Sequence, residues 1–207
     1  QKMVLNHLYE NYDEISDDDM KMYIAALTDS VNSLEELLVN MLEWTKFEMK
    51  RMEYKPINFD IRDICFNEVV PLFNTIAQKK QITIRECDVK LDSYIVYSDI
   101  RMISAVLRNL VSNALKFSPD GKEVVICFND LGNKIKVVVK DYGVGIPEDK
   151  VKLLLSGKSF TTLGTNGEQG SGIGMDLINK MLHQCNSELN IKSVVGEGSE
   201  FSFELKK

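Results

Sequence analysis

The distribution of glycine constrains the fold of this chain more than any other feature of its sequence. Ten of the twelve glycines lie between residues 143 and 198 of the 207-residue chain. Glycine is favoured where the backbone approaches another group closely or adopts a positive φ. These glycines belong mainly to loops at 141–147, 170–174 and 196–201, which follow an asparagine-bearing helical segment at 109–117. This order predicts a nucleotide held between a helix and backbone loops.

The composition is that of a globular protein. Hydrophobic residues make up 44% of the chain and charged residues 27%, as in ordinary folded domains. The net charge of −6 argues against a nucleic-acid partner, which usually requires a basic face. A single phosphate site needs only local positive charge and is compatible with this value. No uncharged apolar run in the sequence approaches the ~20 residues needed to cross a bilayer.

No secretory signal is visible at the start of the sequence. The sequence opens on Gln1 rather than on a start methionine, so we expect a fragment of a longer protein, with any membrane spans upstream. Four cysteines show no CxxC spacing, which indicates reduced thiols and a cytoplasmic location. They are Cys65, Cys87, Cys127 and Cys185.

Residues 20–52 are predicted to form one long helix, which Ser16 caps. Apolar residues with heptad spacing form a seam along one face of this helix. The seam residues alternate spacings of four and three: Met20, Ile24, Leu27, Val31, Leu34, Leu38 and Met41. Apolar residues within 3–12 indicate an earlier helix, so residues 1–54 are predicted to form a helical hairpin. A lone hairpin cannot bury both apolar faces, which favours a dimeric four-helix bundle. The alternative is that the seam packs on the following domain of the same chain.

A boundary is predicted near Pro56, because proline does not continue a helix. Residues 55–207 then mix helix and strand patterns. Helices are expected at 61–80, 99–117, 148–155 and 173–185. Strands are expected at 57–59, 82–86, 94–97, 123–128, 134–140, 188–193 and 199–205. The predicted fold class is α+β, a two-layer α/β sandwich with a mixed sheet.

Four residues lie near one face of the 99–117 helix: Asn109, Asn113, Lys116 and Phe117. Two amide oxygens one turn apart can ligate a hard cation such as Mg²⁺, which retains waters or phosphate oxygens as its other ligands. Lys116 can then meet a phosphate, and Phe117 can flank a base. The alternative for this helix alone is an exposed surface with ordinary polar residues.

Asp141 follows a predicted strand and precedes Gly143 and Gly145. Its carboxylate can accept a hydrogen bond from the exocyclic amine of adenine, whereas guanine presents a carbonyl at that position and would be repelled. Glycine would let the backbone pass close to the base. The alternative is an ordinary turn containing aspartate.

The segment from Gly170 through Gly172 to Gly174 opens the 173–185 helix, where free amides favour an anion. A dinucleotide fingerprint requires GxGxxG directly after a strand, and a P-loop requires glycine where this chain has Lys152. The loop 156–172 is long enough to be a lid over a ligand. The residues 196–198 are predicted to form a plain hairpin turn rather than a ligand contact.

Together these motifs resemble the sensor histidine kinase catalytic domain, a GHKL (Bergerat) ATPase, over residues 57–205. The hairpin before it resembles the dimerisation and phosphotransfer domain of such kinases. The resemblance implies that Asn109 and Asn113 hold Mg²⁺, Lys116 a phosphate, Phe117 the adenine side and Asp141 the adenine amine. It implies that the ATP site also includes Gly143, Gly145, Ile146, Phe160, Gly170, Gly172, Gly174 and Met175.

The resemblance further implies transfer of the ATP γ-phosphoryl to a histidine and then to the aspartate of a response-regulator receiver domain, in a homodimeric protein. The chain departs from the family here, because neither His7 nor His183 is followed by the acid and proline that mark the phosphoacceptor. We therefore expect the acceptor upstream of Gln1. Two alternatives remain: an ATPase of the topoisomerase, mismatch-repair or chaperone type, which lacks such a hairpin, and a nucleotide-binding scaffold without turnover.

Overall fold

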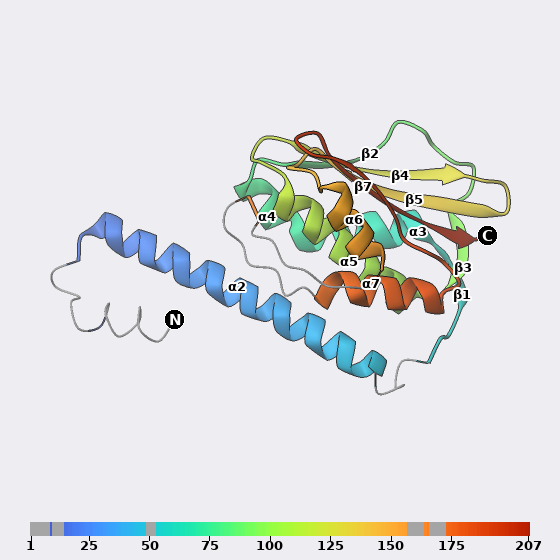
Figure 1. Ribbon diagram of the computed structural model, residues 1–207, viewed down its shortest axis with the longest axis horizontal. Helices are drawn as coiled ribbons and strands as arrows, with labels where there is room; N and C mark the ends of the chain where they lie inside the picture. Colours follow the sequence, from blue (N-terminus) through green and yellow to red (C-terminus); the bar gives the residue numbers. More distant parts are fainter. Residues whose placement is uncertain (1–8, 10–14, 49–52, 157–163, 166–172) are drawn as a thin grey trace.

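The computed structural model describes residue 9 and residues 15–48, 53–156, 164–165 and 173–207 (Figure 1). The helical segments are α2 (Asp17–Glu48), α3 (Ile61–Asp63), the π-helix η2 (Ile64–Val69), the 3-10 helix η3 (Val70–Phe73), α4 (Asn74–Lys79), α5 (Ile100–Phe117), α6 (Glu148–Leu155) and α7 (Ile173–Gln184). The strands are β1 (Ile57–Asp60), β2 (Thr83–Glu86), β3 (Ile95–Ser98), β4 (Glu123–Asp130), β5 (Lys134–Asp141), β6 (Asn190–Val194) and β7 (Gly198–Lys206).

The main sheet has the strand order β2-β4-β5-β7-β6. β2 pairs with β4 in parallel, and the other neighbours are antiparallel, so the predicted mixed sheet is confirmed. Figure 1 shows the sheet on one side and α4, α5, α6 and α7 on the other, as in the expected two-layer sandwich. β1 and β3 form a separate antiparallel pair that the sequence pattern did not distinguish from the main sheet.

The core lies between the sheet and α5. On β4 the inward side chains Val124, Ile126 and Phe128 are fully buried, and the alternation of β4 places its remaining side chains on the outer face. α5 packs against β4 and β5 on one side and against α7 on the other. Burial of this kind is worth roughly 1.5–3 kcal/mol for each large apolar side chain, so the sheet and α5 form a fixed platform for the residues at the ends of α5.

The predicted helix 61–80 is helical throughout but irregular. A short α-helical turn is followed by the π-helix, the 3-10 helix and then α4. The change of hydrogen-bond pattern coincides with Pro71, which has no backbone N–H and whose ring crowds the preceding turn. The extent of the predicted helix is therefore confirmed, and its irregular hydrogen-bond pattern was not predicted.

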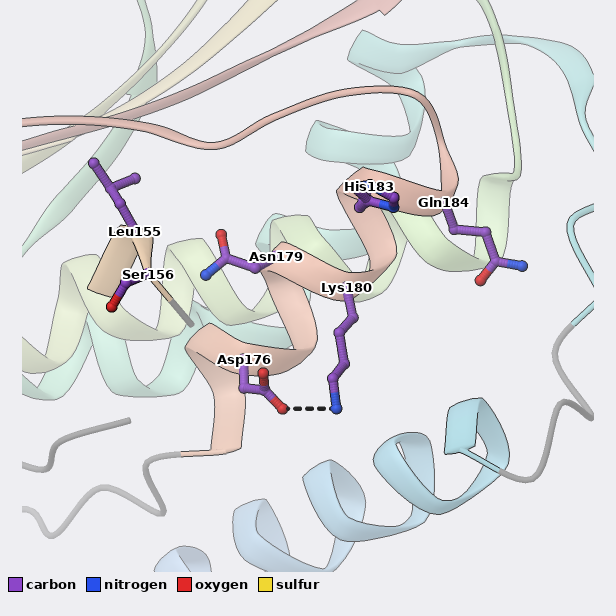
Figure 2. A pocket seen from close by; sticks show the side chains of 7 residues that line it. All are labelled: Leu155, Ser156, Asp176, Asn179, Lys180, His183 and Gln184. Carbon is purple, nitrogen blue, oxygen red and sulfur yellow. Dashed lines mark ion pairs between the residues drawn. The ribbon is translucent and has the colours of Figure 1, made fainter. Parts of the chain in front are cut away.

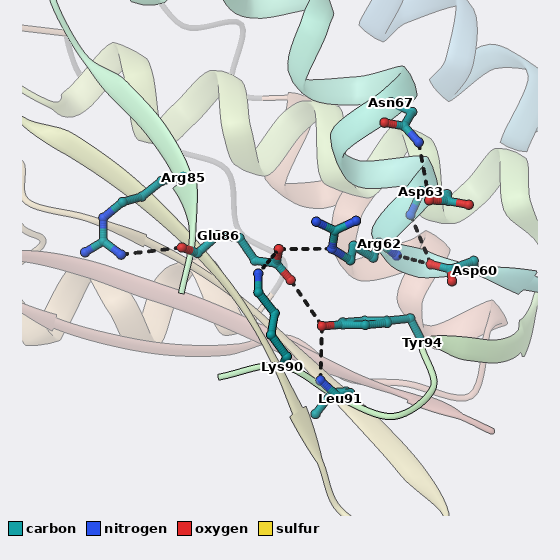
Figure 3. A network of polar contacts seen from close by, with 9 residues as sticks. All are labelled: Asp60, Arg62, Asp63, Asn67, Arg85, Glu86, Lys90, Leu91 and Tyr94. Atoms are coloured by element: carbon teal, nitrogen blue, oxygen red, sulfur yellow. Dashed lines mark hydrogen bonds and ion pairs between the residues drawn. The ribbon is translucent and has the colours of Figure 1, made fainter. Parts of the chain in front are cut away.

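A polar network ties β2 to the helical layer (Figure 3). Glu86 at the end of β2 accepts a hydrogen bond from Arg62 Nε at 2.9 Å, contacts Lys90, and lies 3.3 Å from the Tyr94 hydroxyl. Burial by itself raises the pKa of Glu86, but Lys90 and Arg62 outweigh that effect and hold the pKa below its ordinary value. The Tyr94 ring packs edge-on against Phe128, which links this network to the core.

α2 begins at Asp17, and the backbone N–H of Asp19 donates to Ser16 Oγ at 3.1 Å, so the predicted cap is confirmed. α2 runs along α7 and extends beyond the α/β domain (Figure 1). Most of its seam does not pack on that domain, because five seam residues remain 47–59% exposed: Ile24, Val31, Leu34, Leu38 and Met41. Within the described ranges, no helix is both long and apolar enough to span a membrane.

Candidate nucleotide-binding site

The two asparagines of the site are presented by α5. Asp99 caps the start of the helix through the backbone N–H groups of Arg101 and Met102. One face of α5 is buried in the core, as predicted, and both Asn109 and Asn113 are partly exposed on the adjoining face.

The start of α7 lies against this asparagine face. Asn109 Nδ2 donates to the carbonyl of Ala105 at 3.0 Å, and Asn113 Nδ2 contacts the Met175 sulfur at 3.6 Å. A Cβ added to Gly174 would lie only 2.6 Å from Asn109 Oδ1, so a larger residue there would require the Asn109 side chain to move. With both Nδ2 atoms engaged, the Oδ1 atoms are the ligands that α5 can offer a hard cation. This donor set fits Mg²⁺ that takes its remaining ligands from phosphate and water.

Lys116 and Phe117 occupy the last turn of α5. Lys116 is 8% exposed, and its Nζ lies 5.8 Å from the centroid of the Phe117 ring. The Phe117 carbonyl accepts a hydrogen bond from Val144 N at 3.2 Å. The end of α5 is therefore joined directly to the loop that follows Asp141.

Asp141 is the last residue of β5 and is 3% exposed. Its Oδ1 accepts hydrogen bonds from Gly143 N at 2.9 Å and from Ser199 N at 3.1 Å. Burial raises the pKa of Asp141 to about 6, against the opposing effect of these two backbone N–H groups. Among the described residues, none donates a hydrogen bond to Oδ2. This buried, incompletely satisfied carboxylate can accept a hydrogen bond from a ligand amine.

The glycines after Asp141 allow close packing of the backbone, a role that was not predicted. A Cβ on Gly143 would lie 2.1 Å from the Phe117 carbonyl oxygen. Gly145 has φ +69°, and a Cβ there would lie 2.1 Å from the Val194 carbonyl oxygen. Glycine was predicted so that the backbone could approach a base. In the structure, it allows three backbone segments to pack together: the end of α5, the loop after β5 and the hairpin between β6 and β7.

The predicted hairpin turn at 196–198 is confirmed between β6 and β7. This hairpin also supports the site, because Ile146 N donates to Ser193 Oγ at 2.7 Å and Ser193 Oγ donates to the Gly198 carbonyl at 2.9 Å. Sequence reasoning missed Ser193 and Ser199. No sequence signal could have revealed their role, because it depends on strand pairing between distant segments.

Lys80 and Thr165 were also missed. Lys80 follows α4 and is 4% exposed, and its Nζ reaches the last turn of α5 and the Thr165 hydroxyl. The predicted site residues Phe160, Gly170 and Gly172 lie outside the described residues, as do His7 and most of the predicted lid. His183 is exposed on α7.

A surface cavity of about 550 Å³ lies along α7, and its residue Asp176 directly follows Met175 of the predicted site (Figure 2). It includes the Asp176–Lys180 ion pair at 3.0 Å and shares no residue with the predicted nucleotide site. Its lining residues are Leu155, Ser156, Asp176, Asn179, Lys180, His183 and Gln184. Within the described part of the chain, no group of three or more His, Cys, Asp or Glu could hold a metal ion, so a cation here depends on amide and ligand oxygens.

The chain is similar to several known proteins. Residues 98–207 match the family described as "Histidine kinase-, DNA gyrase B-, and HSP90-like ATPase". The chain is 32% identical to the adaptive-response sensory kinase SasA of Crocosphaera subtropica over 67% of this chain and 36% of that protein. It is 26% identical to the sensor histidine kinase RcsC of Escherichia coli over 88% of this chain and 19% of that protein. The chain thus spans well under half the length of these two relatives.

Solved structures show the same fold. The catalytic domain of histidine kinase ThkA superposes with a TM-score of 0.62 at 26% identity, covering 75% of this chain and 97% of that one. The histidine kinase AdeS of Acinetobacter baumannii superposes with a TM-score of 0.69 at 18% identity, covering 99% of this chain and 93% of that one. The chain therefore belongs to the histidine kinase-, DNA gyrase B- and HSP90-like ATPase family, and its α/β domain is of the kind found in sensor histidine kinases.

Proposed function

We propose that this chain is the kinase core of a two-component sensor histidine kinase that binds ATP with Mg²⁺. The γ-phosphoryl group would pass to a histidine on a segment of the longer protein that precedes Gln1, and then to the aspartate of a response-regulator receiver domain. The observation that carries the ATP assignment is Asp141, a buried carboxylate with one oxygen that no described residue satisfies.

Each described residue has a definite task in this proposal. Asp141 accepts the adenine amine and so selects adenine over guanine. Lys116 binds a phosphate, and Asn109 and Asn113 provide oxygen ligands. Bound Mg²⁺ would neutralise charge on the phosphate oxygens during transfer. Phosphoryl transfer depends mainly on positioning and charge stabilisation, and the fixed end of α5 supplies the positioning.

The names of similar proteins support this assignment. SasA and RcsC are named as sensory kinases. The structure of ShkA, 21% identical, is a complex with AMPPNP, and that of ThkA, 23% identical over the longer match, is a complex with the response regulator TrrA. A receiver domain is accordingly the protein partner that we propose for this chain.

We also propose that residues 1–54 form the dimerisation hairpin and residues 55–207 the catalytic domain. The support is the exposed seam of α2, since exposed apolar rows of this length usually mark an interface. A hairpin before the catalytic domain also favours the kinase over ATPases of the topoisomerase, mismatch-repair or chaperone type.

Light scattering tests the dimer. The variant L34D/L38D should yield monomers, whereas L72D, a control at an exposed leucine of η3, should not. A dimeric L34D/L38D protein would contradict the bundle.

Calorimetry with ATP and GTP, each with and without Mg²⁺, tests the site. ATP should bind with Mg²⁺ and GTP should not, and equal affinities would contradict the role of Asp141. The longer protein, incubated with γ-labelled ATP, should become labelled at an acid-labile, base-stable phosphohistidine. ATP hydrolysis without that label would favour another ATPase class, and binding without any turnover would favour a scaffold.

A further inference from the structure

Lys80 is a buried lysine at the junction of three segments. It follows α4, and its backbone carbonyl accepts a hydrogen bond from Gly121 N at 2.9 Å. Its Nζ donates to the carbonyl of Leu115 at 2.8 Å and lies 3.4 Å from the carbonyl of Lys116. A buried ammonium group is costly unless it is hydrogen-bonded. The last carbonyls of a helix have no partner within that helix and form the negative end of its dipole, so Lys80 and the end of α5 satisfy each other.

Thr165 joins the same cluster from the segment between α6 and α7. Lys80 Nζ donates to Thr165 Oγ1 at 2.8 Å. The backbone N–H of Thr165 donates to the Lys116 carbonyl at 3.1 Å, and its hydroxyl lies 3.1 Å from the carbonyls of both Lys116 and Ser118. Lys80 and Thr165 thus meet on the backbone of Lys116, the residue whose side chain is assigned to phosphate.

We propose that Lys80 is a positioning residue for nucleotide phosphate, which fixes the last turn of α5 and holds Thr165 against it. This role rests on the proposed function, because it acts through Lys116. Replacing the ammonium group would leave the Leu115 and Lys116 carbonyls without this donor and would free the last turn to fray. The orientation of the Lys116 side chain would then be less well defined, whereas Asp141, held by Gly143 and Ser199, would keep its geometry.

The position of the cluster predicts a selective defect. If replacing Lys80 acts through Lys116, it should weaken the binding of ligands with phosphates more than the binding of ligands without them. The appropriate pair is ATP with Mg²⁺ and adenosine, which share the adenine amine that Asp141 would recognise. General destabilisation of the domain would weaken both in parallel.

The experiment uses the whole chain and measures dissociation constants by competition with a fluorescent ATP analogue, well below the melting temperature of each variant. Lys80→Met removes the ammonium group and keeps an apolar stem. It should weaken ATP binding about tenfold, which corresponds to about 1.4 kcal/mol, and should change adenosine binding less than about twofold. Lys79→Met, at the neighbouring exposed lysine, is the matched control and should leave both constants unchanged.

Thr165→Val keeps the shape of the side chain without its hydroxyl and should weaken ATP binding about threefold. Thr165→Ser should retain the wild-type affinity for ATP. In the double variant K80M/T165V, the loss should be smaller than the product of the two single losses, because the two side chains share one contact. Thr165→Val also keeps the test decisive should Lys80→Met fail to fold.

Wild-type affinity in K80M and T165V would overturn the role of Lys80 while leaving the proposed function intact. An equal loss of ATP and adenosine would also overturn it, because it would identify a purely structural lysine. Failure of the wild-type chain to bind ATP would instead remove the proposed function, and this role with it.

Discussion

Two buried aspartates, one at each end of α5, differ in how completely they are satisfied. Asp99 is 0% exposed and accepts hydrogen bonds from the backbone of Lys55, Arg101 and Met102, together with an ion pair from the Arg101 guanidinium at 2.8 Å. Asp141 is 3% exposed and accepts only two backbone hydrogen bonds from described residues. The first carboxylate is saturated by its own protein, and the second has acceptor capacity left for a ligand.

The pKa values of the two groups reflect this difference. Burial raises the pKa of Asp99, but Arg101 and the backbone N–H groups outweigh it and hold the pKa below its ordinary value. Burial of Asp141 prevails and raises its pKa to about 6. Ionised Asp99 therefore stabilises the fold above the ordinary aspartate pKa, and this stability is lost as the pH falls through the folded-state value. Ionised Asp141 instead destabilises the fold, so the contribution of this carboxyl to the free energy of unfolding falls as the pH rises from about 4 to about 6.

The largest expected effect is the loss of nucleotide affinity caused by Asp141→Asn. The amide oxygen can still accept from Gly143 and Ser199, but the Nδ2 group would then face the adenine amine, donor against donor. ATP affinity should fall more than about 100-fold by calorimetry, with an unchanged far-ultraviolet circular dichroism spectrum. An affinity within threefold of wild type would remove the distinction between the two aspartates.

The next effect is on stability, and it has the opposite sign. Because ionised Asp141 is disfavoured in the fold, Asp141→Asn should raise the free energy of unfolding at pH 7 by up to about 3 kcal/mol, the value of a shift from the ordinary pKa to about 6. The gain should shrink to a small fraction of that value near pH 4, where the folded-state carboxyl is protonated and the unfolded-state carboxyl is about half protonated. Urea unfolding from pH 4 to pH 7.5 checks this, and a gain that does not vary with pH would contradict it.

Asp99→Ala should show the reverse pattern. It removes the cap of α5 and leaves the Lys55 N–H without its acceptor, so the free energy of unfolding should fall by about 2 kcal/mol at pH 7. ATP affinity should change less than about threefold, because the far end of α5 is held by other contacts. If Asp99→Ala impaired binding as strongly as Asp141→Asn, the two carboxylates would share one role.

Glu86 is an intermediate case with the smallest expected effect. It is satisfied by Arg62, Lys90 and Tyr94, but the two cations are partly exposed. Glu86→Gln should lower the free energy of unfolding by about 1 kcal/mol at pH 7. Since the pKa of Glu86 lies below its ordinary value, the loss should vanish as the pH falls through the folded-state pKa. Nucleotide binding should be unaffected in the same calorimetric assay.

The sequence predicted most of the elements whose cause is local. The cap at Asp99, the helix that follows it and the helix at 148–155 were predicted nearly residue for residue. Caps and apolar periodicity act over a few positions and can be read directly. The break at Pro71 could have been expected from the same reasoning, but the separate pairing of β1 with β3 could not, because strand pairing joins residues that are distant in the chain.

The candidate site shows the same contrast between features with local causes and features that depend on distant residues. The described asparagines, Lys116 and Asp141 were predicted as ligands, and that role stays a prediction. The structure places the first three on α5 and joins the end of α5 to the loop after Asp141 through the hydrogen bond from Val144 N to the Phe117 carbonyl. The surroundings that determine their chemistry were not predicted. The raised pKa of Asp141 follows from burial by a hairpin more than fifty residues away, and the contacts of Lys80 depend on the last turn of α5, which is distant in the sequence. Such contacts require three-dimensional coordinates.

The hydrogen bond from Ser199 N to Asp141 has a practical consequence for shortening this protein. All the ligand residues proposed from the sequence precede position 176, so a C-terminal deletion ending after α7 would retain every one of them. Such a deletion would also discard β7, and with it the backbone N–H that binds Asp141, the proposed adenine acceptor, and the strand that pairs with β5. The smallest nucleotide-binding piece must therefore extend past Ser199, and tags or fusions belong after Lys207 rather than within the final hairpin.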